Sequence, residues 1–309
     1  MRRKRVTSKA RRPLLASALL TIAATARAQD IEPRAFSNAP VGVNFLIGGY
    51  AYTRGGLSFD PAVPVTNAHL QTSSAILAYA RVLDLWGMSG KFDVIAPVTW
   101  LSGTANFAGQ PVERTVDGLG DARFRLSVNL YGAPALTLRE FATYQQDLII
   151  GASLQVMAPV GQYDSTRAVN LGTNRWSFKP ELGLSKALGP LTLELTAGTT
   201  FYTDNTNFLG GRTRSQDPIT SVQGHAIYGF PRGIWASLDA TYFTGGRTTI
   251  DGEANSDLQR NWRLGATLSF PLSARHSVKL YGSSGVSART GNNYDLIGIA
   301  LQYRWGGGL

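Results

Sequence analysis

The chain has 309 residues, of which 43% are hydrophobic and 16% charged, with a formal net charge of +10 and no cysteine. This length is ample for a buried core, so a peptide hormone, a disulfide scaffold and a disordered tail are excluded. The lack of cysteine excludes thiolate metal sites but is compatible with both oxidising and reducing compartments.

Residues 1–28 have the three parts of a secretory signal peptide. A basic stretch ends at Arg12, an apolar run covers residues 14–26, and small residues flank Arg27 at the end. The apolar run is too short to span a bilayer as a helix, although a retained N-terminal anchor stays open as an alternative. These 28 residues hold eight of the 30 basic side chains and no acidic one, so they carry +8 of the net charge. The mature part, 29–309, is therefore near +2, and nucleic-acid binding loses its electrostatic support.

The mature chain alternates apolar and polar residues with a period of two. Leu191, Leu193 and Leu195 share one parity, for example, while Thr192 and Glu194 share the other. This alternation predicts β-strands. About twelve such strands are predicted, near 41–52, 75–85, 90–101, 121–131, 148–159, 176–187, 191–203, 219–230, 233–243, 261–270, 276–288 and 295–305. Each is close to the ~9 to 11 residues that a tilted strand needs to cross hydrocarbon.

The connections between these strands alternate in length. Short joints are expected at 86–89, 188–190, 231–232 and 271–275, and long polar links at 54–74, 102–120, 160–175, 204–218 and 244–260. Outer-membrane barrels show this alternation, with short periplasmic turns and long outer loops, whereas a soluble periplasmic β-protein does not require it. One link, 132–147, is long where a short one is expected, and its apolar spacing after Pro134 predicts a small amphipathic helix below the barrel.

The apolar parity of each strand is expected to face lipid and the polar parity the lumen, since a charge in hydrocarbon costs roughly 2 to 4 kcal/mol near the midplane. The charged and titratable residues predicted to face the lumen are Arg81, Lys91, Asp93, Arg123, Arg125, Lys179, Glu181, Glu194, His225, Asp239, Arg263, Lys279 and Arg304. Two interpretations are open for this set. It is either a polar constriction that selects solutes or an ion-pair network that fills a narrow barrel.

Aromatic residues near the strand ends fit the girdles of a membrane barrel. The residues expected there are Tyr50, Tyr52, Trp86, Trp100, Trp176, Tyr202, Tyr228, Tyr242, Trp262, Tyr303 and Trp305.

Motifs of catalysis are missing from the sequence. There is no His-Glu-x-x-His, no Gly-x-Ser-x-Gly and no phosphate-binding glycine-rich lysine loop. The three histidines, His69, His225 and His276, are far apart and lack ligand spacing to a carboxylate, so no metal, cofactor or enzymatic activity is predicted. A lipid-modifying barrel enzyme is the remaining catalytic alternative. It is disfavoured because His225 shares its parity with Ser221 and Gln223 and faces inward.

Several runs of the sequence resemble the phenol meta-pathway degradation family of outer-membrane transporter-like proteins. They are Gly118-Leu119-Gly120-Asp121, residues 129–136 and 170–176, residues 42–45 with Asp60-Pro61, and Gln216-Asp217-Pro218 followed by His225. The resemblance covers about the whole mature chain in order. It implies an outer-membrane barrel associated with aromatic catabolism and a role in uptake, and it carries no binding residues.

These observations together predict an all-β, antiparallel up-and-down barrel formed by residues 29–309, in the outer membrane of a Gram-negative bacterium, with both termini periplasmic. The predicted function is passive uptake of small, hydrophobic or aromatic solutes. A plugged barrel with a structural or surface-interaction role is the alternative. The expected partners are outer-membrane lipid, the barrel-assembly machinery and the solute, with no nucleic acid and no cofactor. The sequence leaves the oligomeric state open.

Overall fold

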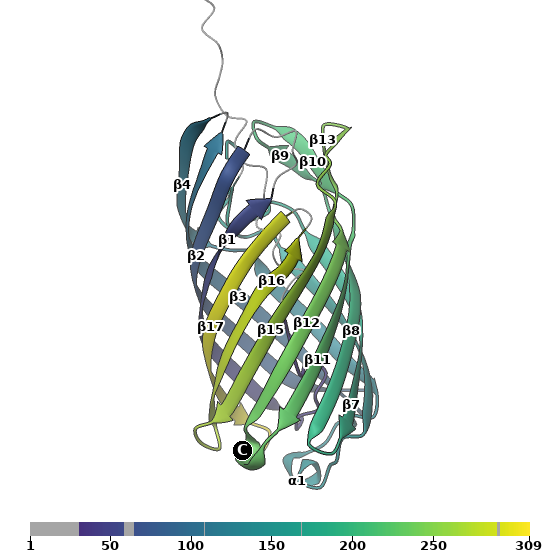
Figure 1. The fold of residues 1–309 in the computed structure, drawn as a ribbon. Helices are drawn as coiled ribbons and strands as arrows, with labels where there is room; N and C mark the ends of the chain where they lie inside the picture. The colour runs from purple at the N-terminus through teal and green to yellow at the C-terminus, as the bar shows by residue number, and fades with distance from the viewer. Residues whose placement is uncertain (1–30, 59–64, 108, 168, 289–290) are drawn as a thin grey trace, which may run out of the picture.

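The computed structural model describes residues 31–58, 65–107, 109–167, 169–288 and 291–309, so the predicted signal peptide lies outside the described residues. The described chain forms a closed antiparallel β-barrel (Figure 1). The all-β barrel of about twelve strands is thus confirmed. Its wall contains β1 (Val43–Ser58), β2 (Val65–Leu85), β3 (Met88–Phe107), β5 (Ala122–Tyr131), β6 (Leu148–Ala158), β7 (Ser177–Leu188), β8 (Leu191–Tyr202), β11 (Ile219–Gly229), β12 (Trp235–Gly245), β15 (Gln259–Pro271), β16 (His276–Ala288) and β17 (Gly291–Gly306).

The fourth position in the wall is shared by two strands. Residues Val98–Phe107 of β3 pair with β4 (Gln110–Leu119), and residues Gly90–Ile95 of β3 pair with β5. Between them the strand is interrupted at Gly120 and Asp121. The next strand, β6, pairs with β5 and ends at Ala158, so among the described strands β4 pairs with β3 alone. The barrel wall is therefore irregular at this position.

Strands extend into the regions predicted as long polar links, which corrects that part of the sequence analysis. β1, β2 and β3 continue beyond their apolar parts, and β4 lies within the predicted link 102–120. A separate small sheet forms from β9 (Asn205–Phe208), β10 (Arg212–Gln216), β13 (Thr248–Ile250) and β14 (Glu253–Ala254). The apolar alternation fades where strands leave the bilayer, because neither face has lipid to contact there.

The two ends of the barrel differ. One end, called the loop end here, carries the long hairpins and the small sheet (Figure 1). The other, called the turn end, carries the short turns, η2 (Pro231–Gly233), α1 (Leu138–Phe141) and the C-terminus. Helix α1 lies within the long link 132–147, where a small helix is predicted, and a capping box joins Thr137 and Glu140 at its start. No helix in the described part of the chain is long and apolar enough to cross a membrane.

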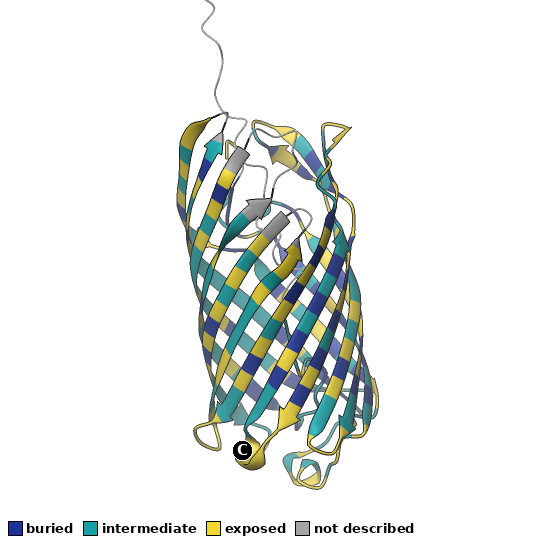
Figure 2. Cartoon of the chain, in the orientation of Figure 1, coloured by how far each residue is buried: buried dark blue, intermediate teal, exposed yellow. Residues whose placement is uncertain are grey.

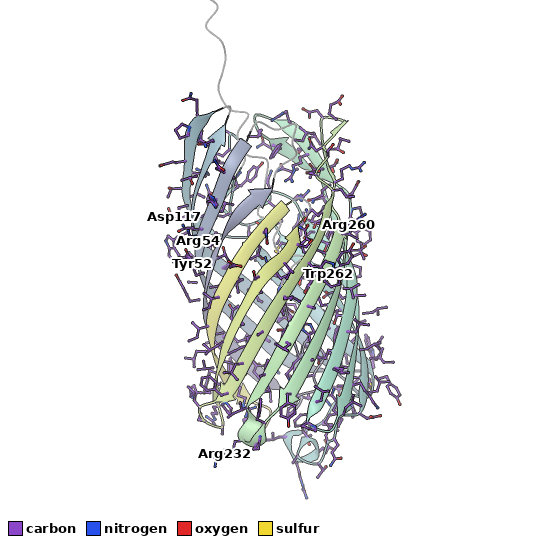
Figure 3. The ribbon with its side chains drawn as sticks, in the orientation of Figure 1. Tyr52, Arg54, Asp117, Arg232, Arg260 and Trp262 are labelled. Atoms are coloured by element: carbon purple, nitrogen blue, oxygen red, sulfur yellow. The ribbon has the colours of Figure 1, made fainter. Side chains whose placement is uncertain are left out.

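Exposure alternates along the strands as predicted (Figure 2). Leu193 and Leu195 on β8 are 44% and 50% exposed, whereas Glu194 between them is 8% exposed. Charged residues on the outward parity lie toward the barrel ends. Arg54, Asp117 and Arg260 are near the loop end, with the aromatic residues Tyr52 and Trp262 beside them (Figure 3). Between these ends, the outward face of the described strands is apolar or uncharged, which suits a hydrocarbon band.

Two predicted side-chain directions are wrong. Arg81 was expected in the lumen, but it shares the outward parity of Leu77 and pairs across the sheet with the exposed Phe92. Both parities of this strand are mostly apolar, so the alternation does not orient it. Tyr202 was expected in an aromatic girdle, but it shares the inward parity of Glu194, and the guanidinium of Arg175 lies 4.4 Å from its ring centre.

Candidate functional site

The interior of the barrel holds a segment that precedes β1. Residues 31–40, called the lumen segment here, have no strand pairing of their own. Next to the segment, the backbone N–H of Val41 donates to Leu136 O at 2.8 Å and that of Gly42 to Val82 O at 3.0 Å, at the turn end. From there the segment reaches inward-facing side chains of the wall. Its irregular sequence has neither helical nor strand periodicity, so sequence analysis gave no sign of this position.

Phe36 anchors the lumen segment in a seat formed by two glycines. Its side chain is 5% exposed and packs with Ala133 and Ile149. A Cβ atom at Gly151 would lie 2.2 Å from the ring, and one at Gly183 would lie 2.1 Å from it. Both glycines are on the inward parity of neighbouring strands, β6 and β7. A side chain at either position would therefore exclude the ring, and the lack of one creates the seat.

Glu32 places its carboxylate between two arginines of β5. Its Oε1 lies 2.5 Å from a terminal nitrogen of Arg123, and its Oε2 contacts Arg125. Arg123 and Arg125 share the inward parity, so both side chains project into the lumen. We call these two residues the arginine clamp. Each carboxylate oxygen has its own guanidinium, an arrangement with strong charge-assisted hydrogen bonds.

The clamp keeps Glu32 ionised. Burial by itself raises the pKa of this carboxyl, but the charges of Arg123 and Arg125, with their hydrogen bonds, oppose burial and prevail. The pKa of Glu32 consequently lies well below its ordinary value. The carboxylate therefore binds as an anion throughout the neutral pH range.

Other predicted lumen residues form ion pairs beside the clamp. Asp93 accepts from Nε of Arg125 at 2.9 Å, and Lys179 lies 2.7 Å from Glu181. Glu194 accepts from the hydroxyl of Ser185 at 2.9 Å and from the backbone N–H of Arg34 in the lumen segment at 2.7 Å. The wall and the lumen segment are thus joined by polar contacts as well as by Phe36.

His225 pairs with a carboxylate on the neighbouring strand. Its Nδ1 lies 2.7 Å from Oδ1 of Asp239, whose other oxygen accepts from Ser237. Local spacing gives no sign of this pair, because the two residues are 14 apart along the chain and meet only across neighbouring strands. The short β11–β12 turn places residue 239 directly opposite 225. Both side chains are buried inside the barrel, away from lipid.

The remaining predicted site residues are spread along the barrel. Arg263 is buried, donates to Ser283 and to the backbone carbonyl of Tyr294, and lies over the Tyr294 ring. Lys91, Lys279 and Arg304 are on the inward parity, and Arg304 donates to the carbonyl of Ala274 at the rim of the turn end. Without Arg81, the predicted set contributes seven basic and four acidic side chains to the inward parity.

A small cavity of about 20 Å³, with room for about one water molecule, lies beside the lumen segment. Its lining includes Glu32, Phe36, Arg123, Arg125, Lys179 and Glu181. The cavity therefore brings together the arginine clamp and the aromatic side chain of the segment. Among the described residues, no group of three or more His, Asp or Glu side chains is arranged to hold a metal ion.

A second structured region lies at the wall interruption near the loop end. Asp121 is fully buried, and its carboxylate accepts from the backbone N–H groups of Gly161 and Thr173 and from the Thr173 hydroxyl, at 2.7 to 3.0 Å. Next to it, Val169 and Leu171 of the same loop pack on inward-facing Leu101 and Val116. The described residues of the loop 159–176, which exclude 168, thus close the barrel beside β4. Gly120, Asp121 and part of this loop belong to the sequence runs that carry the family resemblance.

Comparisons with solved structures give outer-membrane barrels. The COG4313 outer membrane channel from Pseudomonas putida F1 has a TM-score of 0.76 and 20% identity, covering 89% of this chain and 100% of its own. The transport unit of the autotransporter AIDA-I from Escherichia coli has a TM-score of 0.51 and 8% identity, covering 87% and 92%. At these identities the likeness shows the fold, an outer-membrane barrel, and not the solute.

No curated protein sequence matches the chain. A family model described as "Putative MetA-pathway of phenol degradation" matches residues 53–304, which include nearly all of the barrel wall. The protein belongs to this family.

Proposed function

We propose that the protein is a passive outer-membrane channel for small hydrophobic or aromatic solutes, and that the lumen segment closes its path in the state described here. The observation that carries the proposal is the polar lumen with a segment held in it without strand pairing to the wall. A wall strand cannot move without breaking its hydrogen-bond ladder. The lumen segment can, because its contacts include the Glu32 ion pairs, the Phe36 seat, Arg34 over the Trp235 ring and single hydrogen bonds, with no ladder of backbone pairs.

The barrel and its family both support transport. The apolar outer band and the inward charges give a closed polar conduit across a bilayer, as in outer-membrane channels. The family description associates its members with phenol degradation, which favours aromatic solutes. No motif for nucleotide binding or energy coupling occurs in the sequence, so movement down a concentration gradient is the expected mechanism.

A second route for a hydrophobic solute lies through the wall interruption. The apolar cluster of Leu101, Val116, Val169 and Leu171 lies just inside it. A solute that reached this cluster would pass sideways into the bilayer if the loop 159–176 moved from Asp121. This route is a variant of the same function, since the barrel would still act as a passive conduit.

A permanently plugged barrel with a structural role is the second candidate function, and the packed lumen is the observation that favours it. Liposome swelling with a neutral aromatic solute that protein-free liposomes exclude, phenyl glucoside, distinguishes the two. We expect uptake with the full mature chain and faster uptake after deletion of residues 31–38. If neither protein admits the solute, or supports conductance in a planar bilayer, the channel is refuted and the plugged barrel is favoured.

The lipid-modifying enzyme requires a different test. The His225–Asp239 pair is buried within the lumen, where lipid acyl chains do not contact it. We expect no hydrolysis of phospholipid in mixed micelles. Activity that disappears in His225→Ala, with the fold retained, would establish the enzyme instead.

A further inference from the structure

The lumen segment occupies two neighbouring seats that differ in chemistry. The arginine clamp holds the carboxylate of Glu32, and the glycine seat of Gly151 and Gly183 holds the benzene ring of Phe36. Glu32 and Phe36 are four residues apart and line one cavity. A carboxylate and a benzene ring are also the two parts of a small aromatic acid.

We infer that the arginine clamp is a binding site for the carboxylate of a small aromatic acid, and that Glu32 is a tethered competitor which this solute displaces. The inference rests on the proposed channel function and names the class of its solute. Arg123 and Arg125 present terminal nitrogens to separate oxygens of one carboxylate, which a free carboxylate could equally contact. The ring of the solute would enter the glycine seat as Phe36 leaves it.

The charge around the clamp favours an anion over a neutral molecule. When Glu32 withdraws, Arg123, Arg125 and Lys179 line the cavity with Glu181 as the acidic member. Asp93 and Glu181 each already contact one of these cations, at 2.9 and 2.7 Å. Withdrawal of Glu32 therefore leaves one positive charge in excess among these residues, and one bound carboxylate neutralises it. A neutral phenol would leave the clamp without a counter-charge.

Displacement does not require the barrel to unfold. After the segment, the backbone N–H of Val41 donates to Leu136 O in the link 132–147 and that of Gly42 to Val82 O in β2, both at the turn end. The residues before them have no strand pairing. The solute therefore exchanges one carboxylate for another and one ring for another. Binding and opening are coupled, because the segment that closes the lumen is the one that the solute replaces.

The test measures binding of benzoate, acetate and benzamide to the full mature protein in micelles by calorimetry. Benzoate should bind more tightly than acetate, which lacks the ring, and than benzamide, which lacks the charge. Glu32→Gln removes the competing anion and should tighten benzoate binding by about tenfold or more, because the state in which the clamp is free to bind benzoate becomes the major one. Glu113→Gln, an exposed acid on β4, is the matched control and should leave all three affinities unchanged.

An engineered disulfide tests displacement directly. A Cβ at Gly151 would lie 2.9 Å from Cγ of Phe36. The Cβ atoms of a Phe36→Cys, Gly151→Cys pair are then at most about 4.4 Å apart, within the range for a disulfide. The chain has no other cysteine, so this bond is unambiguous. The Gly151→Cys side chain narrows the glycine seat in both redox forms, so the probe is acetate, which needs only the arginine clamp. The oxidised form, which keeps Glu32 in the clamp, should bind acetate about tenfold or more weakly than the reduced form.

The inference is overturned if Glu32→Gln leaves benzoate affinity within twofold of the parent, or if the oxidised and reduced disulfide variants bind acetate equally. It is also overturned if Arg125→Gln added to Glu32→Gln retains the tightened binding. Should that double variant fail to fold, the disulfide pair decides alone. Permeation is measured separately by liposome swelling. Tight, Glu32-sensitive binding without permeation supports the site and refutes the channel, whereas permeation without it supports the channel and refutes the site.

Discussion

Truncating Phe36 to alanine should open the lumen without harming the barrel. The ring is nearly fully buried between β6 and β7, and its seat exists because Gly151 and Gly183 lack side chains. Alanine leaves this seat empty. The wall itself loses none of its strand pairing, so the change acts on how firmly the lumen segment is held.

The size of the effect follows from burial. Replacing a buried phenylalanine by alanine costs about 3 to 5 kcal/mol in protein cores. The lower value is appropriate here, because the displaced ring of the parent would still contact apolar atoms in the lumen. A loss of about 3 kcal/mol, at 1.36 kcal/mol for each factor of ten, raises the ratio of displaced to seated segment by roughly 150-fold.

Single-channel recording in planar bilayers measures this ratio as the open probability. Gly151→Ala should have the same direction of effect, since its Cβ would lie 2.2 Å from the ring and force it out. Combined with Phe36→Ala, it should add little, because the ring it excludes is already absent. Gly48→Ala is the control, as a Cβ at that position would meet nothing within 4 Å.

Two results would refute this reasoning. One is an open probability for Phe36→Ala equal to that of the parent in a correctly folded barrel. The other is strict additivity of Phe36→Ala and Gly151→Ala, which would mean that the two positions act independently and that the glycine seat does not hold the ring.

Three further predictions concern other parts of the molecule. The pKa of Glu32 lies below its ordinary value of 4.5, so the stability it contributes is present above that pH and is lost only as pH falls further; recordings at pH 8 and 5 should show the same open probability. Asp121→Ala should lower the free energy of unfolding by roughly 3 kcal/mol, because buried donors lose their acceptor, and should speed proteolysis of the loop 159–176. The exposed control Asp117→Ala should do neither, and equal cleavage rates would contradict the role given to Asp121. Leu195→Arg on the lipid face should destabilise the barrel folded in liposomes by about 2 to 4 kcal/mol, and Thr220→Arg near the loop end by about 0 to 1 kcal/mol. Urea titration measures both, and equal costs would contradict the position of the hydrocarbon band.

The strands of the wall were predictable because each carries its own signal. The alternation at Leu193, Glu194 and Leu195 is local, and it places lipid-facing and lumen-facing groups without reference to the rest of the chain. Where that signal is weak, the prediction is wrong. Arg81 is on a strand that is mostly apolar on both parities. Strand β4 lies in the part of the wall that leaves the bilayer, where no apolar alternation marks it.

Part of the site was within reach of the same reasoning. A short turn at 231–232 between two predicted strands fixes their register, and that register pairs His225 with Asp239. Reading cross-strand positions from turn lengths would have identified this contact. Such reasoning extends only between consecutive strands.

Sequence alone determined that this protein is a membrane barrel with charges on its inner face, because lipid imposes one rule on every strand and each strand records it separately. The tertiary structure decided what lies within. Glu32 contacts Arg125 across 93 residues, and the backbone of Arg34 contacts Glu194 across 160. No local pattern links such distant positions; only closure of the barrel, which brings all inward faces together around one axis, makes the lumen segment their common partner.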